Sequence, residues 1–205
     1  MNLPIIYKQS ENSLILFINT WANLYSFSSE AIYKTSISKK TLTKTDIQNL
    51  YVWKNGMPLS VLKQKSLDTK IKTKLSKINA FKNDAVIDIR LFRKEFKSLS
   101  TVWKIFLLHI INPNKYPIYD QHIHRAFLFI HNEDWSNISN TSINNKAKEE
   151  FYFNRYLPFI EKQNIQDIKK LDEAFFAFGQ FLVIGNQAIL LNGKFSFGSL
   201  QKRTI

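Results

Sequence analysis

Apolar residues recur along most of this chain at the three- and four-residue spacing of an amphipathic α-helix. That spacing places them on one face, which a helix can bury against its neighbours. The pattern is clearest in seven segments: SLILFINTWANLYSF, TDIQNLYVW, AVIDIRLFRKEF, VWKIFLLHII, HIHRAFLFI, KEEFYFNRYLPFI and LDEAFFAFGQFLVI. Only the C-terminal stretch AILLNGKFSFGSL favours a short hairpin, with Asn192-Gly193 as its turn. The sequence therefore predicts an all-α protein with at most one short hairpin.

Residues that end helices lie between these segments. Glycine, proline and asparagine interrupt helical backbone or favour turns. They occur at Asn55-Gly56, Pro58, Asn112-Pro113, Pro117 and Gly185-Asn186. We therefore expect several helices joined by short polar connectors.

Size and composition exclude several classes of protein. A chain of 205 residues with 44% hydrophobic residues can bury a core of its own, and one domain is expected. The absence of cysteine excludes disulfides, thiolate zinc sites and cysteine-bound iron–sulfur clusters. The longest apolar run, IFLLHII, is too short to cross a bilayer, and we recognise no signal peptide. We expect a cytoplasmic monomer that does not insert into membranes.

Positive charge is concentrated in one part of the chain. Residues 31–104 carry 17 of the 29 lysines and arginines against 5 acidic residues, a net charge of +12. A basic surface of this kind binds a polyanion such as DNA or RNA, because neutralised phosphates release counterions. The alternative is a solvated lysine-rich face without a partner.

One acidic residue lies between a proline-containing turn and a basic helix start, in the segment NPNKYPIYDQHIHRAFLFI. Pro117 disfavours helical backbone at Tyr116, so the next helix begins after the turn. Asp120 directly precedes QHIHRAFLFI, the position of an N-cap, where aspartate contributes about 1 kcal/mol. A second helix, entered at Ser100 or Thr101, comes before the turn. Capping alone is a sufficient role for most such aspartates.

The order of helix, short loop, YPIYD and helix resembles the helix-hairpin-helix (HhH-GPD) DNA glycosylase superfamily. Asp120, His122, Ile123 and Arg125 match the family motif D-x-H-[IV]-x-R, and YPIY is similar to the loop before the aspartate in adenine-removing members. The resemblance covers residues 98–127 and rests elsewhere on the order of helices.

The family's fold implies a single glycosylase domain over residues 1–205, with two helical lobes and a cleft between them. One lobe would span about 30–115 and contain the basic segment. The other would combine about 1–29 with 116–205. The partner would be double-stranded DNA, and no cofactor or metal is expected.

The resemblance also implies a chemistry. Breaking an N-glycosidic bond passes through an oxocarbenium-like sugar, which the ionised Asp120 carboxylate would stabilise. The target base would first be flipped out of the duplex. Lys104, sixteen residues before Asp120, corresponds to the lysine that forms a Schiff base in members that also cut the strand. Its alternative is an ordinary surface lysine, with water as the nucleophile.

The hairpin departs from the family pattern. Members usually carry a glycine-rich L-P-G-x-G turn whose amides approach a DNA phosphate, whereas this chain has KSLSTVWK, without glycine. Hydroxyl side chains would then donate instead, or lysines would take over the contact. The residues expected at DNA are Lys97, Ser98, Ser100, Thr101, His122 and Arg125.

Aromatic residues and one histidine are candidates for a base pocket or wedge, namely Trp53, His109, Tyr116, Tyr119 and Phe176. Each has a plain alternative as a core residue. The sequence does not specify which base is excised, and both a damaged base and a hypermodified base in phage DNA are candidates. It also leaves open whether the role is repair or defence. Two other functions also remain: a non-catalytic helical DNA-binding module, and an RNA-binding or nuclease-like toxin, for which no acidic metal cluster is evident.

Overall fold

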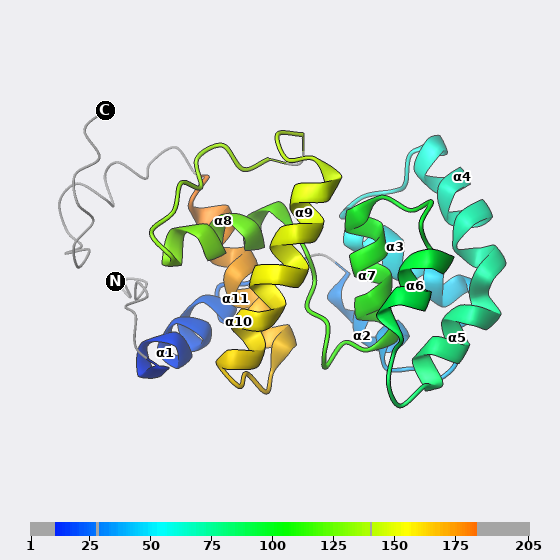
Figure 1. The fold of residues 1–205 in the computed structure, drawn as a ribbon, viewed down its shortest axis with the longest axis horizontal. Coiled ribbons are helices and arrows are strands. Elements are labelled where there is room, and N and C mark those ends of the chain that lie inside the picture. The colour runs from blue at the N-terminus through cyan, green and yellow to red at the C-terminus, as the bar shows by residue number, and fades with distance from the viewer. Residues whose placement is uncertain (1–10, 28, 140, 184–205) are drawn as a thin grey trace. The chain divides into compact units, whose positions relative to one another are not determined.

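The structure is a computed structural model that describes residues 11–27, 29–139 and 141–183. Across these ranges it contains helices and turns and no strand (Figure 1). The predicted all-α class is therefore confirmed. The expected hairpin near Asn192-Gly193 lies outside the described residues. None of the helices in the described ranges is long and apolar enough to cross a membrane.

The chain divides into two compact units. Unit 1 combines the residues up to Tyr25 with those from Pro117 onward, and unit 2 is the continuous stretch Ser26–Tyr116. Unit 2 contains 18 lysines and arginines against 6 acidic residues, so it holds most of the chain's net charge. Asp120 belongs to unit 1, whereas Lys104 belongs to unit 2.

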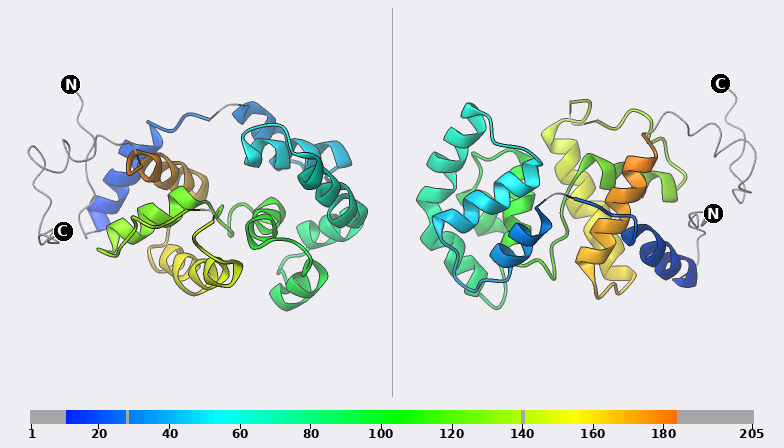
Figure 2. Two further views of the ribbon diagram at one scale, coloured as in Figure 1. Left: turned by 90° about the horizontal axis from the view of Figure 1, so that it is seen from above. Right: turned by 180° about the vertical axis from the view of Figure 1, so that it is seen from behind.

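Unit 2 is a bundle of short helices (Figure 2). In chain order these are α2 (Glu30–Ile37), α3 (Lys44–Asn55), α4 (Val61–Lys70), the 3₁₀ turn η1 (Lys72–Lys74), α5 (Leu75–Asn83), α6 (Ile89–Glu95) and α7 (Thr101–Ile111). Helix α3 begins at a capping box in which Thr43 and Asp46 bond each other's backbone amides, and it ends at Gly56 with φ 72°. Helix α7 begins after Ser100 and ends at Asn112, as the sequence predicts.

The lysine-rich stretch that forms α4, η1 and α5 has no strong apolar pattern, and the sequence did not predict these helices. Their contribution to the core is small, consisting of Leu67, Ile71, Ile78 and Phe81. A few buried residues spread over more than 20 positions leave the helical period weak. Contacts with the rest of unit 2 stabilise these helices.

The predicted helix AVIDIRLFRKEF is shorter than expected. Helix α6 begins only at Ile89, because the Asp88 carboxylate caps it and accepts hydrogen bonds from the amides of Arg90 and Leu91 at 2.9 and 3.0 Å. The three residues before Asp88 are not helical. An internal N-cap therefore overrides the apolar pattern.

Unit 1 is built around its last described helix. Its elements are α1 (Glu11–Ala22), α8 (Gln121–Ile130), α9 (Asn145–Phe151), the π-helical turn η2 (Tyr152–Tyr156), α10 (Leu157–Lys162) and α11 (Ile168–Phe181). Helix α11 packs against both α1 and α8. Phe17 of α1 contacts Phe175 and Phe178 of α11 with ring centroids 5.6 and 5.2 Å apart. This packing determines where α8, and Asp120 before it, can lie.

Candidate functional site

Asp120 occupies the N-cap of α8, as predicted. Its backbone is extended, with φ −145° and ψ 157°, and its carboxylate Oδ1 accepts a hydrogen bond from the amide of His122 at 3.0 Å. The side chain is half-buried. The carboxylate therefore has a fixed direction relative to α8.

The loop before Asp120 is held by hydrogen bonds from distant residues. The amide of Ile118 donates to Oδ2 of Asp172 at 2.7 Å, and the hydroxyl of Tyr152 donates to the carbonyl of Pro117 at 2.8 Å. Asp172 is only 3% exposed, and its other oxygen accepts from the hydroxyl of Tyr156 at 3.0 Å. Buried polar groups that are fully paired rigidify their surroundings. Asp120 thus follows a loop with little freedom to move.

The π-helical turn carries two tyrosines that hold this region, one through the loop and the other through Asp172. A π turn carries one more residue than an α turn and redirects the side chains on it. Tyr152 and Tyr156, at its two ends, are both fully buried and both hydrogen-bonded, one to the loop and the other to Asp172. Asp172 and the two tyrosines are not among the site residues predicted from the sequence. No local signal marks them, because their partners lie 16 to 54 residues away.

A buried tyrosine and histidine flank Asp120. The hydroxyl of Tyr119 lies 3.0 Å from Nδ1 of His124, whose ring stacks on Phe151 with centroids 3.6 Å apart. Burial, together with the positive charges of Arg155, Arg125 and Lys148, lowers the pKa of His124 to about 4. Burial also raises the pKa of Tyr119, and the Asp120 charge adds to that shift. Both side chains are therefore neutral at physiological pH.

Arg125 joins the start of α8 to the segment that follows the helix. Its Nε donates to the carbonyl of Ile138 at 2.7 Å, and its NH1 lies 2.9 Å from Nδ1 of His122. A guanidinium only donates, so Nδ1 of His122 accepts and the ring carries its proton on Nε2. Burial lowers the pKa of Arg125, while the nearby Asp120 carboxylate opposes that shift. At 7% exposure, Arg125 orients His122 within unit 1.

Helices α8 and α11 approach closely at Gly179. A Cβ on Gly179 would lie 1.9 Å from the carbonyl oxygen of His122, a distance that no side chain tolerates. Phe176, one turn earlier on α11, packs edge-on against the His122 ring with centroids 5.1 Å apart. The position of the α8 start therefore depends on a glycine of another helix.

In unit 2 the turn between α6 and α7 borders a pocket of about 270 Å³. Ser98 and Ser100 line it together with Lys63, Ser66 and Lys70 of α4, and its other lining residues are Leu62, Leu99 and Trp103. The ammonium of Lys70 donates to the carbonyl of Ser98 at 3.2 Å. The spacing of Lys63, Ser66 and Lys70 places them on one face of α4, a signal that was present in the sequence.

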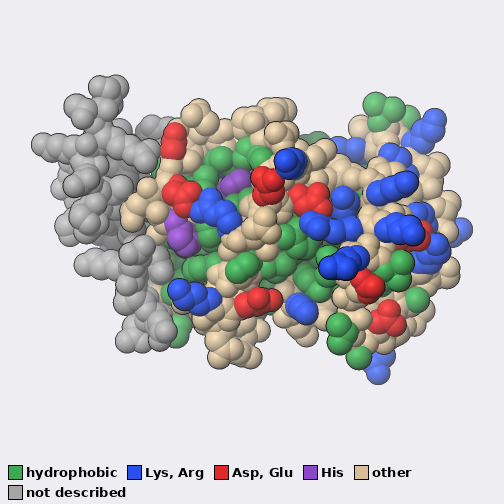
Figure 3. Space-filling view, in the orientation of Figure 1, with side chains coloured by type: hydrophobic (Ala, Val, Ile, Leu, Met, Phe, Trp, Pro, Cys, Tyr) green, Lys and Arg blue, Asp and Glu red, His purple; other side chains and the backbone are tan. Residues whose placement is uncertain are grey.

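The other residues predicted to contact DNA at the hairpin differ in exposure. Lys97 is exposed, whereas Thr101 is 3% exposed at the start of α7. Figure 3 shows many lysine and arginine side chains on the drawn face of unit 2. Several are paired with acidic residues, as Lys74 and Lys77 are with Glu95 at 2.8 Å each. Such pairs are already balanced in the net charge of unit 2, which comes from the remaining basic side chains.

His109 and Trp53 lie in the interior of unit 2. His109 is fully buried, with Nε2 2.6 Å from the hydroxyl of Tyr33 and Nδ1 2.7 Å from the carbonyl of Tyr116. Trp53 is 6% exposed, stacks on Tyr33 and donates from its indole nitrogen to Glu30 at 3.2 Å. Tyr116 is 3% exposed. These contacts are those of core residues, and a role in a base pocket stays a prediction.

Lys104 lies in the first turn of α7, where its amide donates to the carbonyl of Ser100 at 2.9 Å and its side chain is half-buried. Its predicted partnership with Asp120 stays a prediction.

Across the described part of the chain, no group of three histidine, aspartate or glutamate side chains is arranged to hold a metal ion.

Comparisons with protein-family models, with curated proteins and with solved structures found no match to this chain. Over the residues that the structure describes, the fold is all-helical and divides into two compact units.

Proposed function

We propose that this chain is a DNA N-glycosylase that releases a damaged or modified base with the help of Asp120. The observation that most favours this proposal is the set of hydrogen bonds that hold the loop and the helix start on either side of Asp120. Its loop is bonded to Asp172 and Tyr152, and its helix start is bonded through Arg125 and His122. Hydrogen bonds that fix the backbone on both sides of one capping residue are typical of a functional carboxylate, whose orientation has to be held.

The proposed role of Asp120 is electrostatic. As the glycosidic bond breaks, positive charge develops on the sugar, and a carboxylate held in a fixed direction stabilises that charge without reorganising. Water completes the reaction by adding to the anomeric carbon, and the base leaves with its bonding electron pair and gains a proton. The neighbours Tyr119 and His124 are neutral, so neither adds a positive charge that would offset the carboxylate.

DNA would be held by unit 2. Its net charge of +12 favours a polyanion. The pocket beside the α6–α7 turn offers the ammonium groups of Lys63 and Lys70 and the hydroxyls of Ser66, Ser98 and Ser100. These side chains would supply the phosphate contacts that a glycine-rich hairpin makes through its amides. This agrees with the absence of glycine in KSLSTVWK.

Asp120→Asn tests the proposal, because asparagine is also a good N-cap but carries no charge. We expect base release to fall by at least about a hundredfold while the free energy of unfolding changes by less than about 1 kcal/mol. The assay uses duplexes that carry alkylated, oxidised or hypermodified bases, with release measured by chromatography. Base release by the variant at the wild-type rate would rule out the proposed role.

Borohydride trapping decides the part played by Lys104. The proposal uses water, so we expect abasic DNA with an intact strand and no covalent adduct. An adduct that forms with the wild type and is absent in Lys104→Ala would instead show a Schiff base followed by strand cleavage.

A second candidate is a DNA-binding module without catalysis. It is favoured by the hydrogen bond between Asp120 and the His122 amide, which alone accounts for an aspartate at this position. This candidate predicts duplex binding that is equal in the wild type and Asp120→Asn, with no base released by either.

A further inference from the structure

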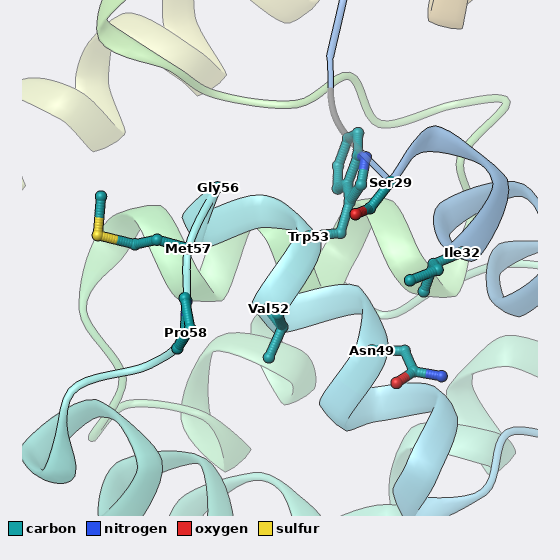
Figure 4. A pocket seen from close by; sticks show the side chains of 8 residues that line it. All are labelled: Ser29, Ile32, Asn49, Val52, Trp53, Gly56, Met57 and Pro58. Atoms are coloured by element: carbon teal, nitrogen blue, oxygen red, sulfur yellow. The ribbon is translucent and has the colours of Figure 1, made fainter.

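Unit 2 contains a second pocket of about 270 Å³, to which the roles proposed for Asp120 and for the α6–α7 turn assign nothing. It is formed by α2, α3 and the turn after α3 (Figure 4). Its walls are mainly apolar, with Ile32 from α2, Val52 and Trp53 from α3, and Met57 from the turn. Apolar walls with a few polar groups are typical of small-molecule sites, and this volume lies just below their usual range.

The walls are held in place by contacts behind them. Trp53 stacks on Tyr33 with centroids 4.2 Å apart. The carboxamide of Asn55 donates to the carbonyls of Met57 and Pro58 at 2.9 and 3.3 Å, which shapes the turn. Lys63 in turn donates to Asn55 at 2.6 Å. The pocket is therefore preformed, and a ligand does not have to order it.

Two polar side chains line the pocket without a hydrogen-bond partner among the described residues. One is the carboxamide of Asn49, which is half-buried, and the other is the hydroxyl of Ser29. Ser29 precedes α2 with φ 64°, in the left-handed region, and its hydroxyl does not cap the helix. A serine in ordinary cap geometry would use its hydroxyl on the helix. Both groups are left to water or to a ligand.

We infer that this pocket binds a nucleobase. None of its lining side chains carries a charge, so the ligand is neutral. A carboxamide presents a donor and an acceptor side by side, which matches the adjacent donor and acceptor on a base edge. The Trp53 ring and the Met57 thioether offer a polarisable surface to a flat ring.

This inference goes beyond the proposed glycosylase. The pocket lies in the unit that lacks Asp120, and binding there breaks no bond. The base can come from a free nucleoside or from an unpaired position in a strand, because both present the same ring and edge. Other neutral ligands fit less well: an alkyl chain would leave the half-buried carboxamide of Asn49 unpaired, which disfavours its binding.

The test is a titration of the isotope-labelled full chain with adenosine, guanosine, cytidine and thymidine, followed by nuclear magnetic resonance. We expect at least one nucleoside to shift both the Trp53 indole signal and the Asn49 carboxamide signal. Asn49→Leu keeps the volume but removes the paired donor and acceptor, so affinity should fall about tenfold or more. Asn114→Ala, at an exposed asparagine in the turn after α7, serves as the matched control and should bind as the wild type does.

A second variant, Met57→Ala, keeps the test valid if Asn49→Leu fails to fold, because Met57 is 66% exposed and its truncation leaves the core intact. It should weaken binding as well. A single-stranded oligonucleotide and an abasic strand of equal length show whether a base within a strand binds as a free nucleoside does, since only the first strand offers bases.

Two outcomes would overturn the inference. One is the absence of any shift at Trp53 and Asn49 with every nucleoside and with the base-bearing strand. The other is binding that both variants leave unchanged. The readout involves no base release, so a failure of the glycosylase proposal would leave this result unaffected.

Discussion

Asp172 is the residue on which the geometry before Asp120 most depends. It is buried, and its two oxygens accept from the Ile118 amide and the Tyr156 hydroxyl. A carboxylate accepts at both oxygens, whereas a carboxamide turns a donor toward one of them. The same residue therefore contributes to the stability of unit 1 and to the position of Asp120.

Asp172→Asn should lower the free energy of unfolding by about 2 kcal/mol, because a carboxamide has one acceptor oxygen where the carboxylate has two, so the buried Tyr156 hydroxyl proton loses its acceptor. Urea unfolding measures this. Glu161→Gln, an exposed change in the same unit that also removes one charge, should stay within about 0.5 kcal/mol. Equal stabilities of Asp172→Asn and the control would contradict the role assigned to Asp172.

His124 makes stability depend on pH. Its pKa of about 4 in the folded protein lies below its ordinary value of 6.5, so in this interval the unfolded chain binds a proton that the folded chain does not. The stability that the neutral His124 ring contributes is fully present above pH 6.5 and is lost as pH falls toward 4. The groups that face the ring are Tyr119 and Phe151, with the charges of Arg125, Arg155 and Lys148 nearby.

We expect wild-type unfolding free energy to fall between about pH 7 and about pH 4.5 by roughly 2 kcal/mol more than that of His124→Gln, which has no titrating ring. Urea unfolding at both pH values gives the two differences. Carboxylates titrate equally in both proteins, so the comparison isolates His124. Identical pH profiles would show that the ring has the same pKa in the folded and the unfolded chain.

At the scale of elements, the contact between α8 and α11 decides where the Asp120 helix begins. Gly179 allows the two backbones to meet at His122, and Phe176 packs on the His122 ring. A glycine inside a helix ordinarily lowers its stability relative to alanine. The backbone of Gly179 lies in the αR region, which any residue can adopt, so its conformation does not require glycine. The close approach of the His122 carbonyl in α8 explains why glycine occurs here.

Gly179→Ala should therefore destabilise the protein by about 3 kcal/mol, against the intrinsic preference of the helix for alanine. Thermal unfolding is the measurement. The neighbouring exposed change Gln180→Ala should cost less than about 0.5 kcal/mol. A stabilised Gly179→Ala protein would mean that α8 and α11 are not packed this closely.

At the scale of the whole molecule, charge is divided unequally between the two units. Unit 2 carries a net charge of +12 out of +13 for the chain, a figure in which ion pairs such as Lys72 with Asp68 already count as neutral. Binding to a duplex through such a surface depends mainly on the number of phosphates neutralised. The salt dependence of binding therefore reports on unit 2.

Affinity for an unmodified duplex should fall on the order of a hundredfold between about 50 and 200 mM salt, as expected for roughly four neutralised phosphates. The double change Lys63→Gln with Lys70→Gln should reduce the slope of log affinity against log salt by about 2. Lys146→Gln with Lys162→Gln in unit 1 removes the same charge and should leave the slope unchanged. Fluorescence anisotropy measures both, and a flat salt response would show that the basic face is merely solvated.

The sequence by itself determined the helical class, most helix ends and the N-cap at Asp120. These features follow from interactions within a few residues: the apolar period, the backbone limits of Pro117 and Gly56, and the bond between Asp120 and the His122 amide. The same local view missed α2, α4 and α5, where a weak period conceals helices that are stabilised by packing.

Only the tertiary structure decided how Asp120 is supported and which side chains form pockets. Asp172 meets Ile118 across 54 residues, and Gly179 meets His122 across a helix interface. Asn49 and Ser29 share a pocket only because α2 packs on α3. Such pairings depend on which helix faces meet, and the free energy that selects those faces comes from burying the whole apolar surface at once, which no short stretch of sequence encodes.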